Sequence, residues 1–139
     1  MNARNIAVGG LAAGTILFIL LFCLNLIVNQ IIPYDSTQFA GMRPMEDPVM
    51  TLFYLYPFVL ALGAAWVFDL VHPALPHPAT NKGLSFGLIM IILVAIPSNF
   101  AMYTSMNWPL TFYIGNLIWA GAGFVLTGLV FARIWNLRR

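Results

Sequence analysis

The chain has 139 residues, of which 61% are hydrophobic and 7% are charged, and its formal net charge is +2. Soluble globular domains carry about 25% charged residues, so this composition excludes a water-soluble monomer. The small net charge excludes the basic surface of a nucleic-acid-binding protein. The lone Cys23 excludes an internal disulfide, and the sequence contains no Walker, dinucleotide-binding, zinc-finger or serine-elbow motif. With no catalytic constellation visible, we expect a single non-enzymatic membrane domain.

Three long intervals contain no charged residue, namely 5–34, 48–68 and 83–132. A helix that crosses a bilayer needs about 20 apolar residues, so each of the first two intervals holds one span. The third would be about 75 Å long as one helix, more than twice the hydrocarbon thickness, and must turn back at Asn107-Trp108-Pro109. The pattern predicts an all-α bundle of four transmembrane helices. We expect spans at about 5–29, 48–71, 81–106 and 109–135, and an outer loop at 30–47.

Prolines mark the ends and interruptions of these spans. Asp47 has the properties of a helix N-cap, and Pro48 stands at the first helical position, where proline is favoured. Ending the third span at Pro97 would leave about 15 residues, too few to cross a bilayer. We therefore expect Pro57 and Pro97 to kink the second and third spans without ending them.

The basic residues predict the orientation, because they stay on the cytoplasmic side of a membrane. One side of the predicted bundle carries Arg4, Lys82, Arg133, Arg138 and Arg139, with Asp69. The other side carries Arg43, with Asp35, Glu46 and Asp47. We expect a multi-pass protein of a cell membrane, the inner membrane in a bacterium, with both termini in the cytoplasm. Asp69 is expected to pair with a cytoplasmic Arg or Lys.

Small residues are concentrated in the cytoplasmic halves of the predicted spans. Helices in lipid associate by close backbone approach at such residues. The candidate packing positions are Gly10 and Gly14, Gly83 and Gly87, and Gly121 and Gly123. The alternative is that glycine is simply common in membrane helices.

Polar residues collect in one layer of the outer half, roughly 6–14 Å below the helix ends at ~1.5 Å per residue. The candidate ligand-binding residues are Asn25, Tyr54, Tyr56, Ser98, Asn99 and Asn116. Polar groups at membrane depth face the bundle interior or a cavity, and Pro57 and Pro97 free backbone carbonyls nearby. The layer is either a cup open to the outer side or a set of interhelical hydrogen bonds.

The outer loop mixes apolar with charged residues, as in a segment that packs on a partner or closes over a site. Its candidate lid or partner-contact residues are Tyr34, Asp35, Arg43, Glu46 and Asp47. A passive connector remains the alternative.

Two groups of residues have metal-ligand chemistry, and neither predicts a metal site. Thioethers suit Cu(I), and five methionines lie near the outer surface, Met42, Met45, Met50, Met102 and Met106. Methionine is also a ready filler of apolar gaps. The pair His72 and His77 has no cysteine beside it. We expect no metal and no cofactor.

Residues 5–18 and 43–62 resemble short four-span bacterial membrane proteins of uncharacterised families. The resemblance covers the general layout of the chain and implies no activity and no site residue.

Together with the short length and the Gly-x-x-x-Gly pairs, the layout favours an accessory or structural subunit in membrane lipid. Such a subunit packs against itself, as a homo-oligomer, or against a larger membrane complex. The alternative is a small-molecule binder or facilitator that uses the outer cup. The lack of an ionisable residue at the membrane midplane argues against a proton-coupled pump.

Overall fold

The computed structural model describes residues 2–31, 41, 43–44 and 46–137, except for the side chains of residues 24, 25, 28 and 29. Four helical stretches in this part of the chain are long and apolar enough to cross a membrane. They are Ala3–Cys23, Pro48–Ala74, Ala79–Ser105 and Leu110–Asn136. The predicted all-α, four-span architecture is confirmed.

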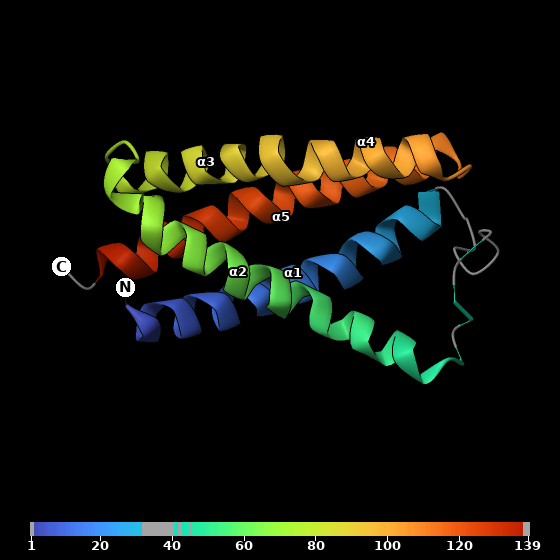
Figure 1. Ribbon diagram of the computed structural model, residues 1–139, viewed down its shortest axis with the longest axis horizontal. Coiled ribbons are helices and arrows are strands. Elements are labelled where there is room, and N and C mark those ends of the chain that lie inside the picture. Colours follow the sequence, from blue (N-terminus) through green and yellow to red (C-terminus); the bar gives the residue numbers. More distant parts are fainter. Residues whose placement is uncertain (1, 32–40, 42, 45, 138–139) are drawn as a thin grey trace.

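The elements follow one another as α1 (Ala3–Ile31), the 3-10 helix η2 (Pro48–Leu55), α2 (Tyr56–Val71), the short 3-10 turn η3 (His72–Ala74), α3 (Ala79–Met90), the π-helical segment η4 (Ile91–Ala95), α4 (Ile96–Ser105) and α5 (Leu110–Asn136). The start of α1, the η3 turn and the end of α5 lie at one end of the molecule, here called the proximal end (Figure 1). The starts of η2 and α5 and the end of α4 lie at the opposite, distal end.

The second span changes helix type next to Pro57. Asp47 caps η2, because its Oδ1 accepts a hydrogen bond from the backbone N–H of Val49 at 2.9 Å. The backbone N–H of Tyr56 donates to the carbonyl of Phe53, a 3-10 pairing, and Pro57 has no N–H to continue the ladder. The interruption expected at Pro57 is therefore a passage from 3-10 to α geometry.

The third span is interrupted by the π-helical segment that directly precedes Pro97. The N–H of Ile96 donates to the carbonyl of Ile91, five residues back, and α4 begins there. A proline ring clashes with the carbonyl four residues before it, here that of Leu93. The wider π turn makes room for the ring, so the chain stays helical across the whole span.

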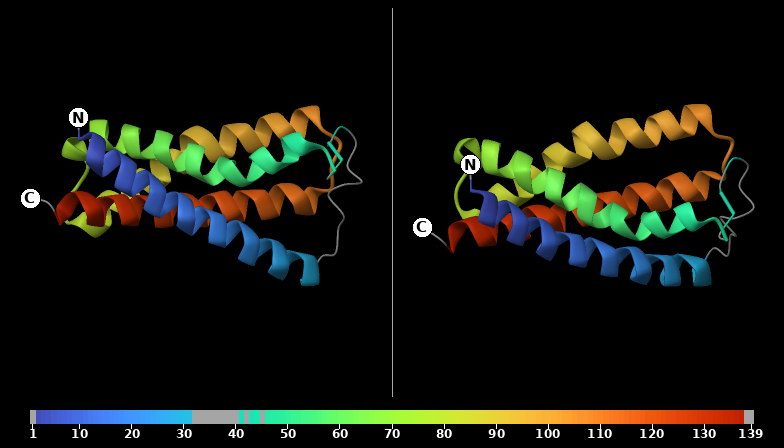
Figure 2. Two further views of the ribbon diagram at one scale, coloured as in Figure 1. Left: turned by 90° about the horizontal axis from the view of Figure 1, so that it is seen from below. Right: turned by 60° about the horizontal axis from the view of Figure 1, so that its bottom comes forward.

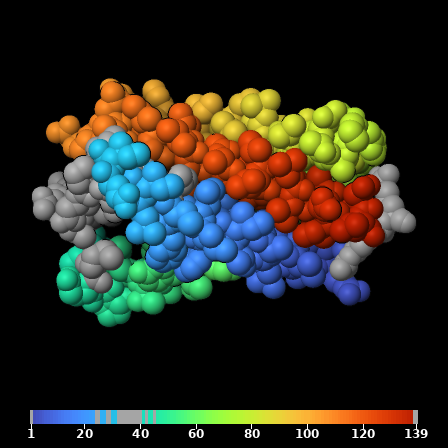
Figure 3. Space-filling view, turned by 180° about the vertical axis from the view of Figure 1, so that it is seen from behind, coloured from blue at the N-terminus to red at the C-terminus, as the bar shows by residue number. Residues whose placement is uncertain are grey.

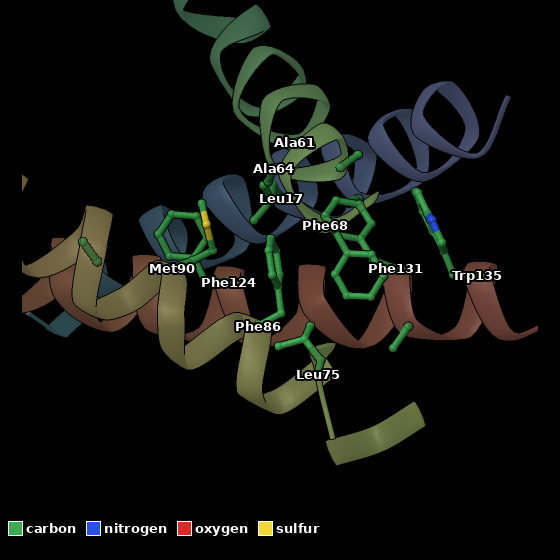
Figure 4. Close-up of a cluster of buried hydrophobic side chains, with 14 residues drawn as sticks. Leu17, Ala61, Ala64, Phe68, Leu75, Phe86, Met90, Phe124, Phe131 and Trp135 are labelled. Atoms are coloured by element: carbon green, nitrogen blue, oxygen red, sulfur yellow. The ribbon is translucent and has the colours of Figure 1, made fainter. Parts of the chain in front are cut away.

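Aromatic rings fill the proximal half of the bundle (Figure 4). Phe68 of α2 is fully buried and lies at the centre, with ring centroids 5.0 Å from Phe86, 5.5 Å from Phe131 and 5.3 Å from Trp135. Small buried residues, among them Ala61, bring the neighbouring helices close to this cluster.

Glycines lie where the helices approach most closely. A Cβ atom built on Gly83 would lie 2.8 Å from the carbonyl oxygen of Gly128, and one on Gly87 would lie 2.8 Å from Cα of Val125. At these two positions any side chain larger than the hydrogen atom of glycine therefore does not fit between the backbones of α3 and α5. Figure 1 shows α3 lying alongside α5, and both views of Figure 2 show α4 diverging from α5 towards the distal end.

Helix α1 packs against α2 and α5, and Figure 3 shows its surface lying along that of α5. A Cβ atom on Gly10 would lie 2.5 Å from Cδ2 of Leu62, and one on Gly14 would lie 2.6 Å from Cδ1 of Phe58.

The two remaining candidate glycines differ from each other. A Cβ atom on Gly123 would lie 2.7 Å from Cδ2 of Leu17. Beside Gly121 the nearest atom is Cδ1 of Ile91, at 4.0 Å, so that position has room for a methyl group.

The distal half is packed much less tightly. Neither η2 nor α4 contains a buried residue. Figure 1 shows η2 lying apart from α4 at this end of the molecule. The described helices are thus closed on one another proximally and leave much of their distal surface to the surroundings.

Candidate functional site

Two residues of the predicted polar layer meet between α4 and α5. The Nδ2 of Asn99 donates to the backbone carbonyl of Tyr113 at 2.9 Å, and the Nδ2 of Asn116 donates to Oδ1 of Asn99 at 3.3 Å. Both side chains are partly buried. These contacts tie the two helices together within the first quarter of α5.

Tyr113 extends this connection to the turn between α4 and α5. Its hydroxyl donates to the carbonyl of Met106 at 2.6 Å and accepts from the backbone N–H of Trp108 at 3.3 Å. Tyr113 is not among the ligand-binding residues predicted from the sequence, yet its side chain is buried. The signal that was available is its spacing, because Tyr113 and Asn116 are three residues apart and share one face of a helix.

A hollow of about 200 Å³ lies beside these residues. It is lined from α4 by Ile96, Asn99, Phe100 and Tyr103, and from α5 by Tyr113 and Leu117. Of the predicted ligand-binding residues, Asn99 is the one that lines it. The remaining walls are aliphatic or aromatic.

The other predicted ligand-binding residues contact different neighbours. Tyr54 stacks on Phe22 of α1, with ring centroids 6.1 Å apart, and Tyr56 lies against Trp119 of α5 at 6.2 Å. Ser98 donates its hydroxyl to the carbonyl of Val94 in its own span. The side chain of Asn25 is outside the described residues.

The polar groups of the spans that lack hydrogen-bond partners within the described part of the chain include the following four. The hydroxyls of Tyr54 and Tyr56 are the first two, on side chains that are 44% and 45% exposed. The buried Nε1 of Trp119 and Oγ1 of Thr127 are the others. Tyr56 lies about 16 Å from the start of η2 at ~2.0 Å per residue, which is near mid-membrane depth.

The described part of the outer loop forms a local clamp. The Arg43 guanidinium donates to Oδ2 of Asp47 at 2.7 Å, while Oδ1 caps η2. The Val49 backbone N–H, and then the Arg43 guanidinium, hold the pKa of Asp47 below its ordinary value. Glu46 is exposed, and the predicted lid residues Tyr34 and Asp35 lie outside the described residues.

Asp69 has partners other than the predicted Arg or Lys. Its Oδ1 accepts from the indole Nε1 of Trp135 at 2.8 Å, and its Oδ2 accepts from the backbone N–H of Asn2 at 3.1 Å. Among the described residues no Arg or Lys pairs with Asp69, and Arg138 and Arg139 lie outside them. Lys82 is directed instead to the carbonyl of His72, at 2.6 Å, where α2 ends. An indole and a backbone amide reach this carboxylate because both chain ends return to the same end of the bundle.

Within the described residues, no three His, Cys, Asp or Glu side chains come together in a way that could hold a metal ion. Of the five methionines considered for copper, Met42 and Met45 lie outside the described residues.

The chain was compared with known proteins. No family model, no curated protein and no solved structure matches it.

Proposed function

We propose that this small integral membrane protein is a non-enzymatic accessory or structural subunit. It packs against another copy of itself or against a larger membrane complex. The four apolar spans support its place in a membrane. The packing role rests on the distal half of the second span.

The observation that carries this proposal is the pair of unpartnered phenols on Tyr54 and Tyr56. Each ring rests on an aromatic neighbour on one side and is nearly half exposed on the other. A polar group without a partner in hydrocarbon costs several kcal/mol. Tyrosine is enriched at protein interfaces, where its ring packs and its hydroxyl finds a partner.

The surroundings of these phenols fit the same role. No residue of η2 is buried, and Phe53 beside them is 50% exposed and stacked on Tyr56 at 6.2 Å. Phe53 and Tyr56, three residues apart, share one face, and Tyr54 lies on the neighbouring face towards α1. A partner that covers both faces would bury the three rings and supply hydrogen-bond acceptors to the two hydroxyls. Lipid tails cover rings but accept no hydrogen bonds.

The experiment is native purification in mild detergent with the mass measured by light scattering. The wild-type protein is expected as a defined homo-oligomer or with a stoichiometric partner. The double variant Tyr54→Phe/Tyr56→Phe keeps both rings and removes both hydroxyls, so it should lose the association while helix content is unchanged. Tyr103→Phe, at a hydroxyl on α4, is the matched control and should retain it. A monomeric wild-type protein, or an association that the double variant keeps, contradicts the proposal.

A second candidate function, a binder or facilitator of a small molecule, is favoured by one observation. Asn99 lines the hollow with a carboxamide whose second N–H is available beside its bond to Tyr113. A ligand held there should raise the melting temperature of the wild-type protein, and Asn99→Leu should abolish that rise. If no compound of a broad panel shifts the wild-type melting temperature, this candidate fails.

A further inference from the structure

The hollow between α4 and α5 begins where the third span stops packing closely against α5. Upstream, Gly83 and Gly87 hold α3 in backbone contact with α5. Downstream of the π-helical segment and Pro97, α4 has no buried residue at all. The same two spans are therefore in close contact proximally and leave a space of about 200 Å³ distally.

Hydrogen bonds keep this space from closing. Asn99 is bonded to the carbonyl of Tyr113 and to Asn116, and the hydroxyl of Tyr113 is bonded to the carbonyl of Met106. These bonds join α4 and the turn after it to α5 beside the hollow and fix the separation of the two helices there. Moving α4 inward would break them within the membrane, where no water replaces the lost partners.

The chemistry of the walls changes along the membrane normal. Ile96 and Leu117 line the deeper part, and Tyr103 lines the part nearest the distal end. Tyr103 is 59% exposed, its ring packs against Tyr113 at 5.3 Å, and its hydroxyl has no partner among the described residues. Water needs two to four polar partners to occupy such a site, and most of these walls offer none.

The dimensions of the hollow restrict what fits. Ile96 and Tyr103 are about 10 Å apart along the helix at ~1.5 Å per residue. One leaflet contains about 15 Å of hydrocarbon, so the hollow covers about two thirds of a leaflet. A volume of about 200 Å³ spread over about 10 Å of length leaves a cross-section of about 20 Å², far less than a transmembrane helix of about 10 Å diameter fills. A single hydrocarbon chain is narrow enough.

We propose that this hollow is a binding site for one acyl chain of a membrane phospholipid. The end of the chain lies against Ile96 and Leu117. The ester region lies level with Tyr103, whose hydroxyl donates to an ester carbonyl. The walls are held apart before the lipid arrives. The acyl chain therefore loses less free energy on being ordered there than lipids do elsewhere on the surface.

The test uses the full-length chain in detergent, stripped of lipid and titrated with palmitoyl-oleoyl-phosphatidylglycerol, with bound lipids counted by native mass spectrometry. Leu117→Trp and Ile96→Trp fill the hollow from its two walls, so one variant answers if the other fails to fold. Ile114→Trp and Leu93→Trp are matched controls, because those side chains are 50% and 67% exposed and lie outside the hollow.

The wild-type and control proteins should bind the first lipid about tenfold more tightly than the second, a difference of about 1.4 kcal/mol. The filled variants should lose that tight first step while their thermal midpoints are maintained. A single-chain lysophospholipid should compete for the same step, because the chain is what the hollow recognises.

Three results would overturn the proposal. One is a series of equal lipid-binding steps in the wild-type protein, which is the behaviour of ordinary boundary lipid. The second is a tight step that the filled variants keep. The third is a lysophospholipid that does not compete, because the site would then recognise something other than the chain.

Discussion

At the scale of single residues, Asp69 connects three parts of the chain that are distant in sequence. Its carboxylate, near the end of α2, accepts hydrogen bonds from Trp135 near the end of α5 and from the backbone at Asn2 before α1. A carboxylate near a helix C-terminus is unfavourably placed in the helix dipole. The two donors offset that cost and hold both chain ends against α2.

Trp135→Phe should destabilise the fold, because it removes a donor to a charged acceptor while keeping an aromatic ring. Hydrogen bonds to charged groups contribute about 1.5–3 kcal/mol, and Asp69 is partly exposed, so we expect about 1–2 kcal/mol. A double-mutant cycle with Asp69→Asn, measured by unfolding in mixed detergent micelles, isolates the pair. Strictly additive effects would show that the two side chains do not interact.

The interactions of Asp47 should make the stability of the distal end depend on pH. Its pKa in the folded protein lies below the ordinary value, so its cap and ion pair stabilise the fold at neutral pH and are lost as pH falls through that lowered pKa. Carbon-13 NMR of the Asp47 carboxyl should show titration below the reference value of about 3.9. Arg43→Gln should raise the midpoint only in part, because the Val49 N–H remains. Titration at or above the reference value would contradict the clamp.

At the scale of helices, the α3–α5 contact depends on the absence of side chains at three positions. Cβ atoms on Gly83 and Gly87 would meet backbone atoms of α5, and one on Gly128 would meet the carbonyl of Gly83. Backbone cannot move aside as a flexible side chain does. The helices must therefore separate to accept even a methyl group.

Gly87→Ala and Gly128→Ala should each destabilise the fold by about 1–3 kcal/mol, the usual cost of overpacking. Gly63→Ala is the matched control, since nothing lies within 4 Å of a Cβ atom built there. Its higher helix propensity should leave stability unchanged or raise it by up to about 1 kcal/mol. Unfolding in mixed micelles measures all three variants. Equal effects at Gly63 and Gly128 would mean that close approach does not hold α3 to α5.

The Gly-x-x-x-Gly pairs and the two prolines were visible in the sequence as elements, but their partners were not. Gly83 and Gly87 could have faced any neighbouring span or lipid, and the structure places them against α5. Pro97 predicts an interruption of the third span. Whether the helix bends there or widens into a π turn depends on the space that the neighbouring helices leave around the proline ring.

At the scale of the whole molecule, the described start of α1 and the end of α5 lie at one end, as an even number of spans requires (Figure 1). Which side of the membrane that end occupies is predicted from the basic residues alone.

Single cysteines test this orientation. In a Cys23→Ala background, Ala40→Cys should react with a membrane-impermeant maleimide in intact cells. Asn136→Cys should react only after the cells are opened, because the positive-inside rule places it in the cytoplasm. Labelling of position 136 in intact cells would reverse the orientation and, with it, the leaflet in which the hollow lies.

The number of spans, their lengths and the capped start of the second span followed from the sequence by itself. The cost of exposing backbone or charge to hydrocarbon leaves few alternatives. The tertiary structure decided which faces meet: Asn99 with Asn116 and Tyr113, Asp69 with Trp135, and a hollow where α4 leaves α5. Such contacts depend on the rotation and separation of each helix about its neighbour. Hydrophobicity does not set this rotation and separation, because all sides of an apolar helix are similarly apolar and lipid is as apolar as a neighbouring helix.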